Sequence, residues 1–398
     1  MFLEREEERI LDGEYGEALA KLMKLLVTLG EIYGADRLLK ISSAHVSGVS
    51  YQNLGDPGLT LIEDLASQRV RARVKATLNP GGMDWEKWKA MGISEGFAGK
   101  QLRLYQAYLQ MGFEATFTCT PYEVGNKPAK GQHVAWAESS AQAYVNSVLG
   151  AKTNRESGIS ALAAALTGRT PNFGLHLDEN RRPTVLFEVE KPVQGVYWFG
   201  ALGYLVGSEA GGGVPYLRNV GKPGLEEFKA FGAAAASSGA IALYHMEDAT
   251  PEASTIKEEE LKDLEKVRVS PRDLKASAGR FQPVEKPDCV FLGCPHCSLG
   301  KLRFLAEAAG GKRFKRKLLV CTSRSVYAEA LRLGYVEALE RAGALVLRDT
   351  CLVVAPIREL GFNSILTDSF KAAHYLAAAG IEASPAETID CLKAALEG

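Results

Sequence analysis

The sequence predicts an α/β protein that is divided into several lobes and built from parallel-sheet units. From residue 289 onward, short runs rich in Val, Leu, Ile and Phe alternate with longer amphipathic stretches. Strands that alternate with helices in this way indicate a parallel sheet. The 398 residues are 46% hydrophobic and include 40 glycines, so the chain can bury a large core that splits into two or three lobes.

The first part of the chain predicts helices that cap the fold, followed by strands. Residues 4–12 and 16–33 are expected to be helical, the second because leucines recur in it at helical spacing. Residues 37–42 and 70–78 predict the first two strands, and residues 114–118 predict another short one.

A serine-rich segment follows the first predicted strand. It places Ser42, Ser43, Ser47 and Ser50 around Gly48. Backbone N–H groups and hydroxyls in such a segment can surround an anion. A solvated serine-rich turn is the alternative, and both interpretations remain open at this point.

Two further polar positions lie next to predicted elements. Asn79 and Pro80 occupy the end of the second strand. Glu138 stands at the approach to a helix, with Ser139 and Ser140 directly after it. A simple N-cap role for one of the two serines is the structural alternative to a functional one.

The middle of the chain predicts more strands and then a boundary. Residues 184–189, 195–199 and 240–245 have the composition of strands. Residues 252–275 are rich in charge, so they are the best candidate for a linker between lobes.

Three cysteines follow predicted strands: Cys119, Cys294 and Cys351. In α/β proteins ligands collect outside the carboxyl ends of the strands, so these distant cysteines can converge. Three thiolates at one site suit an iron-sulfur cluster with one open iron. Cys297 forms a C-x-x-C pair with Cys294, which alone would suggest zinc or redox chemistry, but no second pair accompanies it.

The other cysteines and the charge narrow the class of protein. Cys289, Cys321 and Cys391 are interpreted as small buried residues. Seven cysteines are an odd number, and the highly charged N-terminus has no apolar signal core, which argues for reduced thiols or metal ligands. The formal net charge of -1 and the lack of a long apolar run predict a cytoplasmic protein with a small-molecule substrate and no nucleic-acid or membrane partner.

The C-terminal part predicts a compact α/β unit. Its expected strands and helices alternate over residues 289–292, 298–309, 318–322, 325–342 and 344–347. We therefore expect residues 281–398 to form an α/β unit that carries cluster cysteines, and residues 1–280 to form an N-terminal catalytic α/β region with room for two lobes.

Lys371 falls in the first turn of a later helix, behind the capping residues Thr367, Asp368 and Ser369. The helix dipole disfavours a cation there, so an anionic ligand is one explanation. An ordinary exposed lysine is the other.

Six motifs together resemble the aconitase X family. They are residues 42–48 (SSAHVSG), 79–82 (NPGG), 119–122 (CTPY), 137–141 (AESSA), 150–156 (GAKTNRE) and 293–297 (GCPHC). The resemblance spans essentially the whole chain and does not depend on any single motif. It implies a multi-lobed aconitase-like architecture and an iron-sulfur dehydratase.

By this resemblance a 4Fe-4S cluster is held by Cys119, Cys294 and Cys351. Such a cluster keeps one iron open as a Lewis acid for the leaving hydroxyl. Members of the family either carry a small swivelling domain or use a separate small subunit. This chain has no room for that domain, so it is expected to pair with a small subunit through an apolar-rimmed active-site face. A serine of that subunit is the expected base.

The resemblance also implies the substrate class. Some members dehydrate cis-3-hydroxy-L-proline, and the archaeal branch converts (R)-5-phosphomevalonate to trans-anhydromevalonate 5-phosphate in the mevalonate pathway of isoprenoid biosynthesis. The two-subunit form favours phosphomevalonate, a phosphorylated hydroxy acid. Cis-3-hydroxy-L-proline dehydration and a zinc-stabilised, non-catalytic binding protein are the alternatives.

A phosphate calls for N–H donors and a cation. The expected substrate-binding residues are Gly48, Val49, Ser50, Asn79, Pro80, Glu138, Ser139 and Lys371. Among them Glu138 and Ser139 are expected to orient the reacting end of the substrate. A carboxylate beside an anion is repelled unless it is protonated or faces the hydroxyl, so Glu138 would suit an amine better.

Overall fold

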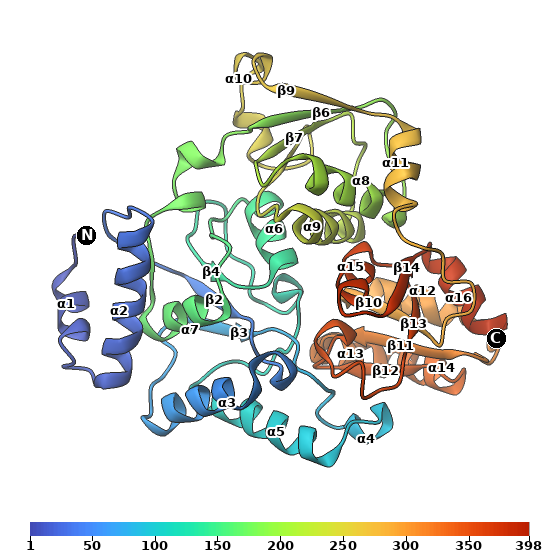
Figure 1. Ribbon diagram of the computed structural model, residues 1–398, viewed down its shortest axis with the longest axis horizontal. Helices are drawn as coiled ribbons and strands as arrows, with labels where there is room; N and C mark the ends of the chain where they lie inside the picture. Colours follow the sequence, from blue (N-terminus) through green and yellow to red (C-terminus); the bar gives the residue numbers. More distant parts are fainter. Residues whose placement is uncertain (398) are drawn as a thin grey trace.

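The computed structural model describes residues 1–397 and forms three lobes, each with its own parallel sheet (Figure 1). The first lobe holds the N-terminus, the middle lobe lies beside it, and the third lobe holds the C-terminus. This arrangement confirms the predicted α/β fold class with several lobes.

The first lobe contains a three-stranded parallel sheet and the helices that cover it. Its strands are β1 (Leu38–Lys40), β2 (Ser43–Val46), β3 (Lys75–Leu78), β4 (Ala135–Trp136) and β5 (Arg169–Pro171). Its helices are α1 (Arg5–Leu11), α2 (Glu17–Ile32), α3 (Tyr51–Ser67), α4 (Trp88–Met91), α5 (Glu95–Gln110), α6 (Ser139–Ser147) and α7 (Gly158–Thr167). The sheet order is β3-β2-β4, and β1 pairs with β5 in an antiparallel ladder. The two N-terminal helices lie at the edge of this lobe, as predicted (Figure 1).

Two strand predictions in this lobe are corrected. The strand predicted over residues 70–78 is limited to β3, because the preceding residues bond elsewhere; the Ala72 N–H, for example, donates to the Met111 carbonyl oxygen at 2.8 Å. Residues 114–118 form no strand. They touch β3 only at separate hydrogen bonds, and Phe117 has a φ of +39° that breaks the extended course.

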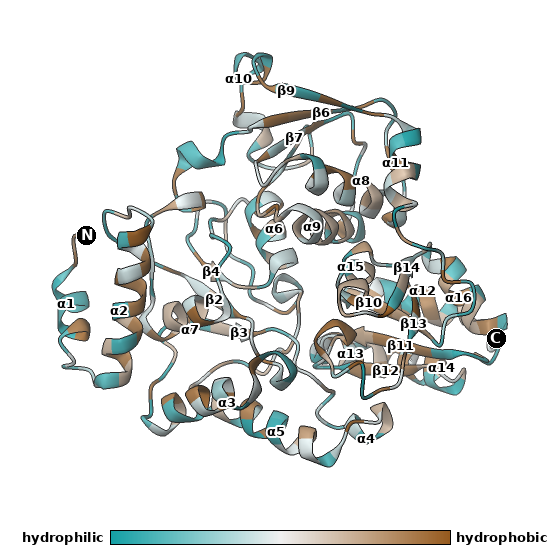
Figure 2. Cartoon of the chain, viewed as in Figure 1, coloured by the Kyte–Doolittle hydropathy of each residue, from teal (hydrophilic) through white to brown (hydrophobic). Residues whose placement is uncertain are grey.

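The middle lobe has four parallel strands in the order β8-β7-β6-β9. They are β6 (Val185–Val189), β7 (Pro215–Arg218), β8 (His245–Met246) and β9 (Glu265–Val269). The helices are α8 (Val196–Glu209), α9 (Leu225–Gly239), α10 (Glu258–Lys262) and α11 (Pro271–Ala278). Strand β6 is largely hydrophobic, whereas the peripheral α10 is hydrophilic (Figure 2).

Three predictions fail in this lobe. Residues 195–199 begin α8 rather than a strand, because this helix is buried on most sides and has no polar face to reveal its period. Of residues 240–245 only His245 lies in β8, since Ala240 is the left-handed C-cap of α9. Residues 252–275 are no linker, because they contain β9, which pairs with β6.

The third lobe confirms the predicted alternation of strands and helices. Its strands are β10 (Cys289–Cys297), β11 (Lys317–Thr322), β12 (Leu345–Arg348), β13 (Ser364–Thr367) and β14 (Glu382–Pro385), in the parallel order β12-β11-β10-β13-β14. Its helices are α12 (Leu299–Ala309), α13 (Arg324–Arg332), α14 (Tyr335–Arg341), α15 (Phe370–Ala378) and α16 (Thr388–Glu397). The single helix expected over residues 325–342 is divided at Gly334, which has a φ of +80°.

Short 3₁₀ turns connect these elements at Pro121–Glu123, Gly174–His176, Asp178–Arg181, Ala253–Thr255 and Leu352–Val354. Within residues 1–397, the helices are all too short or too polar to cross a membrane.

Candidate active site

Three cysteine-bearing segments meet where the first and third lobes face each other. Cys294 lies in β10, Cys351 closely follows β12, and Cys119 ends the segment that runs beside β3. A bridge between Gly81 and Thr350 joins the two lobes here, and the Thr350 hydroxyl donates to the Gly81 carbonyl oxygen at 2.9 Å. This bridge holds strand ends from separate sheets against each other.

The three thiols are buried and lie close to one another. The thiols of Cys294 and Cys351 interact, which lowers the pKa of Cys294 and raises the pKa of Cys351 well above its usual range. Burial raises the pKa of Cys119, and the nearby Glu138 and Cys294 add to the rise. All seven cysteines are free, so the site gathers three reduced thiols.

Gly293 is required for this course of the chain. Its φ is +112°, and a Cβ atom at this position would lie 2.2 Å from the carbonyl oxygen of Cys321 on β11. The pairing of β10 with β11 is irregular between Leu292 and Cys297, just where Cys294 turns toward the other thiols. Only glycine has both the backbone freedom for this φ and the small size for this close approach of β10 to β11.

Two more cysteines lie near the site: Cys321 packs in the same hydrophobic cluster as Cys294 and Cys351, whereas Cys297 packs elsewhere. Cys297 packs in the hydrophobic cluster that contains Val290 and Leu292, whereas Cys294 and Cys351 belong to the cluster with Phe291. Successive strand residues face opposite sides of a sheet, so Cys297 packs on the other side. Within residues 1–397, no three His, Cys, Asp or Glu side chains are arranged to hold a single metal ion.

Beside the thiols, Lys371 and Glu138 form a buried ion pair. The Lys371 ammonium group donates to the Glu138 carboxylate and lies 3.2 Å from the Ser139 hydroxyl oxygen and 3.4 Å from that of Ser140. The Asn79 amide donates to the other oxygen of Glu138 at 3.0 Å. The structure therefore brings together residues from the first and third lobes that the sequence analysis singled out separately.

The ion pair sets the charge of both partners. Burial alone would raise the pKa of Glu138, but the Lys371 charge and hydrogen bonds from Lys371 and Ser140 outweigh it and lower the pKa to about 2. Burial would lower the pKa of Lys371, yet Glu138 and the neighbouring thiols raise it above its usual value. Both groups are charged near neutral pH.

The prediction that a serine is the N-cap of α6 is wrong. Glu138 itself is the N-cap residue, and its side chain accepts a hydrogen bond from the Ser140 N–H at 3.3 Å. Ser139 and Ser140 instead turn their hydroxyl groups to the ion pair, with the Ser140 hydroxyl donating to Glu138 at 3.0 Å. Lys371 lies in the first turn of α15 behind the N-cap Ser369, as predicted.

The serine-rich segment is only in part a turn. Ser43 is buried in β2, and Ser50 is a buried N-cap of α3 whose hydroxyl donates to the Val354 carbonyl oxygen at 2.6 Å. Val49 is buried as well. Among residues 1–397 the N–H groups of Gly48, Val49 and Ser50 have no hydrogen-bond acceptor. A solvated turn is therefore the wrong description for this part of the segment.

Two histidines were not predicted as part of the site. His45 in β2 is fully buried, its Nδ1 lies 2.9 Å from the Thr77 hydroxyl oxygen, and its Nε2 has no partner among the described residues. Burial lowers its pKa to about 4, although the charge of Glu138 acts in the opposite direction. His296 lies between Cys294 and Cys297 and is also fully buried. The only feature of the sequence that could have identified either residue as part of the site is a histidine within an apolar, strand-like segment.

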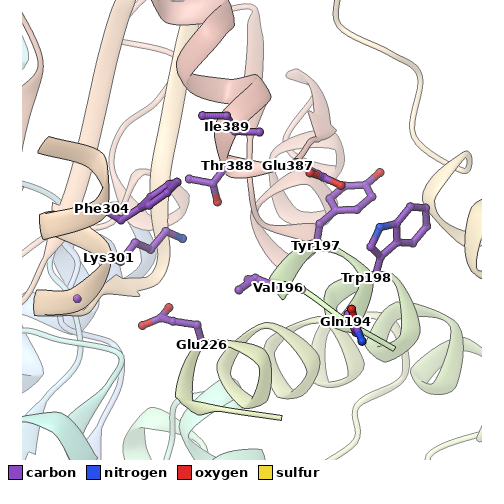
Figure 3. A pocket seen from close by; sticks show the side chains of 12 residues that line it. Gln194, Val196, Tyr197, Trp198, Glu226, Lys301, Phe304, Glu387, Thr388 and Ile389 are labelled. Atoms are coloured by element: carbon purple, nitrogen blue, oxygen red, sulfur yellow. The ribbon is translucent and has the colours of Figure 1, made fainter. Parts of the chain in front are cut away.

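A cavity of about 610 Å³ opens beside the site, between the middle and third lobes. Figure 3 shows Val196, Trp198, Phe304 and Ile389 around this space, with the charged Lys301 at its side. This cavity contains none of the three cysteines. A small cavity of about 20 Å³ shares Val196, Glu226 and Lys301 with it and is lined by Cys294 as well, so the two cavities are neighbours.

Models of the aconitase X family match the chain almost from end to end. The first-domain model matches residues 1–179, the second-domain model residues 183–279 and the third-domain model residues 287–397. The chain is 48% identical over 384 residues to the phosphomevalonate dehydratase large subunit of Methanocaldococcus jannaschii, which covers 94% of this chain and 95% of that protein.

More distant relatives and a solved structure agree. The cis-3-hydroxy-L-proline dehydratase of Pseudomonas aeruginosa is 33% identical over 410 residues, which cover 98% of this chain and 69% of that longer protein. The crystal structure of Thermococcus kodakaraensis aconitase X in its holo-form superimposes with a TM-score of 0.92 at 44% identity and covers 99% of this chain and 100% of that one. As its motifs indicated, the chain belongs to the aconitase X family, whose relatives named here are dehydratases.

Proposed function

We propose that this chain is the large subunit of a phosphomevalonate dehydratase. The observation that carries the proposal is the meeting of three buried cysteine thiols with the Lys371–Glu138 pair. The likeness to archaeal phosphomevalonate dehydratase large subunits over nearly equal lengths supports the choice of substrate.

The proposed reaction removes water from (R)-5-phosphomevalonate to give trans-anhydromevalonate 5-phosphate. A proton leaves the carbon next to the carboxylate, the electron pair of that C–H bond becomes the new C=C bond, and the hydroxyl departs from the next carbon as water. Two difficulties must be met: the proton is weakly acidic, and hydroxide is a poor leaving group.

Cys119, Cys294 and Cys351 fit the requirements of a 4Fe-4S cluster with three protein ligands. When bound, such a cluster supplies an open iron that acts as a Lewis acid toward the departing hydroxyl. The three free, buried thiols lie close together without forming a site for a single ion. Each ligand of a cluster binds its own iron, so the three thiols need not converge on one ion.

Glu138 and Ser139 are proposed to orient the reacting end of the substrate. An efficient general base has a pKa near the working pH, and Glu138 has a pKa of about 2, so it is a poor proton acceptor. This supports a base on the small subunit, where the family resemblance expects a serine. Because Lys371 neutralises Glu138, the carboxylate repels a substrate anion less than an isolated one would.

The phosphate is proposed to bind at the N-terminus of α3. The N–H groups of Gly48, Val49 and Ser50 have no acceptor among residues 1–397, which supports an anion site at the turn that opens α3. A kink at Gly55 separates this turn from the rest of α3, so the N–H groups carry the site rather than a long helix dipole. Asn79 and Pro80 shape the neighbouring strand end. Lys371 supplies the cation for the substrate, either for its phosphate or for its carboxylate.

The small subunit is proposed to cover the open cavity of Figure 3. The cavity has an apolar rim that includes the exposed side chains of Phe304 and Ile389, and it shares Lys301 with the smaller cavity that Cys294 lines. Exposed apolar patches beside a site mark places where a partner binds. A partner here would close the site against water and bring its serine to the substrate.

Two proposals concern the chain as a whole. Residues 281–398 are proposed to form one α/β unit that carries Cys294 and Cys351. Residues 1–280 are proposed to form the catalytic region that carries Cys119. A cytoplasmic location is proposed because the seven cysteines are free, as is typical of a reducing compartment.

Cis-3-hydroxy-L-proline dehydration is the second candidate, because a largely buried carboxylate such as Glu138 can hold an amine. The deciding experiment assays the complex of both subunits, reconstituted without oxygen, on both compounds. We expect turnover of phosphomevalonate and none of cis-3-hydroxy-L-proline, and the reverse would overturn the proposal. Stoichiometric zinc without iron or sulfide in the purified chain would instead favour a zinc-stabilised binding protein.

A further inference from the structure

His296 is fully buried, and both nitrogens of its ring have partners. Its Nε2 lies 2.8 Å from the Thr350 carbonyl oxygen, and its Nδ1 lies 3.0 Å from the Thr118 hydroxyl oxygen. A carbonyl oxygen only accepts, so Nε2 carries the hydrogen, and in a neutral ring Nδ1 accepts from Thr118. Burial lowers the pKa of His296 to about 4, which keeps the ring neutral near pH 7.

The backbone of His296 is fixed as well. Its N–H donates to the Cys119 sulfur at 3.2 Å, and its carbonyl oxygen accepts from the Lys229 ammonium at 2.8 Å. Lys229 reaches across from α9 of the middle lobe, and it is buried between Glu123 (3.0 Å) and Glu226 (3.3 Å). The ammonium group is therefore neutralised and held in one position.

These contacts make His296 the junction of the three cysteine segments. It follows Cys294 by two positions, its ring bonds to the residues that directly precede Cys119 and Cys351, and its N–H bonds to Cys119 itself. Cys294 lies in a strand of the third-lobe sheet and Cys351 closely follows another strand of it, but Cys119 belongs to another lobe. The position of Cys119 relative to the other two thiols therefore depends on contacts of this kind.

We propose that His296 is a positioning residue that fixes the mutual geometry of the Cys119, Cys294 and Cys351 thiols. Lys229 holds it in place from the middle lobe. This inference rests on the proposed cluster. The ring is fully buried and both of its nitrogens bond to residues next to the cysteines, so its proposed action is on the thiols. Removing a group that orients metal ligands typically weakens metal affinity about 10–100-fold.

The test compares His296→Phe, His296→Gln and the control His245→Phe after anaerobic cluster assembly. His245 is a buried histidine whose Nε2 also donates to a carbonyl oxygen, that of Arg181 at 2.8 Å, but it lies in β8. Iron and sulfide per chain, the visible and electron paramagnetic resonance spectra, and the rate of cluster loss in air are measured. We expect His296→Phe to lose its cluster about tenfold faster or more. His296→Gln, which keeps a donor and an acceptor, should be intermediate, and His245→Phe should resemble wild type.

A purely structural histidine would give a different result. A folded His296→Phe protein with wild-type iron content, spectra and rate of cluster loss would overturn the inference. If His296→Phe does not fold, the same measurements are made on Thr118→Val and Lys229→Met. Each of these variants removes one contact to His296 and keeps the imidazole ring in place. Wild-type cluster retention in both would overturn the inference, and faster loss in either would support it. A wild-type chain that binds no iron and sulfide would refute the proposed cluster function first.

Discussion

The Lys371 ammonium group and the Glu138 carboxylate pair inside the protein, although they come from different lobes. Lys371 lies at the positive end of the α15 dipole, where a cation is disfavoured, and Glu138 lies at the N-terminus of α6, where an anion is favoured. The carboxylate thus compensates for the unfavourable position of the lysine. Their pairing joins the third lobe to the first beside the cysteine thiols.

Replacing Lys371 by Met should therefore have two effects. It leaves Glu138 buried without its cation, which costs about 3–5 kcal/mol of unfolding free energy, and it weakens binding of phosphomevalonate. Urea unfolding of the cluster-free chain measures the first effect, and titration of the complex with phosphomevalonate measures the second. The matched control is Lys371→Met with Glu138→Gln, which should recover most of the stability but none of the activity. Unchanged affinity for phosphomevalonate in Lys371→Met would remove Lys371 from the substrate site.

The cysteine assignment gives a second prediction. Ser in place of Cys119, Cys294 or Cys351 should abolish dehydration and most of the visible absorbance of the cluster, because a hydroxyl is a poor ligand compared with a thiolate. Cys391→Ser is the matched control, since Cys391 is buried in α16 and should retain both properties. Full activity of Cys294→Ser would point to Cys297 or Cys321 as the ligand instead.

Much of the third lobe could be predicted from the sequence because its signals are local. Runs of β-branched and aliphatic residues alternate with capped helices, as at Ser298 before α12. The position of Lys371 in the first turn of α15 also followed from capping residues alone. Its partner Glu138 lies more than two hundred positions away, so no local pattern connects the two.

The failures have a common physical cause. The start of α8 resembles a strand because a helix buried on nearly all sides has no polar stripe, and the sequence then carries no helical period. The segment with β9 resembles a linker because that strand has exposed, charged residues. His296 could not be recognised as the junction of three segments, because its partners Thr118 and Thr350 are defined only by the tertiary fold.

A third prediction concerns pH. Burial lowers the pKa of His45 and of His296 to about 4 and that of His176 to about 3. In the unfolded chain a histidine titrates near about 6.5, so between these values the unfolded state binds more protons. Stability of the cluster-free chain should therefore fall as the pH falls from about 6.5 to about 4, with a loss of about 3 kcal/mol for each of the first two residues.

Urea unfolding midpoints at several pH values across this range test the effect. His296→Gln should show a shallower decline than wild type, because one of the groups that titrates between the folded and unfolded values is gone. Glu138 adds a further loss only at lower pH, since its folded pKa is about 2 and its contribution disappears as the pH falls through that value. Asp349, whose pKa burial raises to about 6, acts in the opposite direction over this range but does so equally in both chains. The same slope in His296→Gln and wild type would therefore contradict the burial of a neutral His296.

The last prediction concerns the face proposed for the small subunit. Phe304 is 46% exposed on α12 at the rim of the open cavity, and a partner that covers this rim would bury its ring. Phe304→Glu should weaken binding of the small subunit by at least about 2 kcal/mol, or about thirtyfold, because a charge would be buried where an aromatic anchor belongs. Leu331→Glu is the matched control, since Leu331 is 41% exposed on α13 and lines none of the cavities described above.

Titration of each chain with the small subunit gives the dissociation constant, and the cluster content shows whether the chain itself is intact. Equal binding by wild type and Phe304→Glu would place the small subunit on another face, whereas weaker binding by both variants would indicate a general effect of added negative charge.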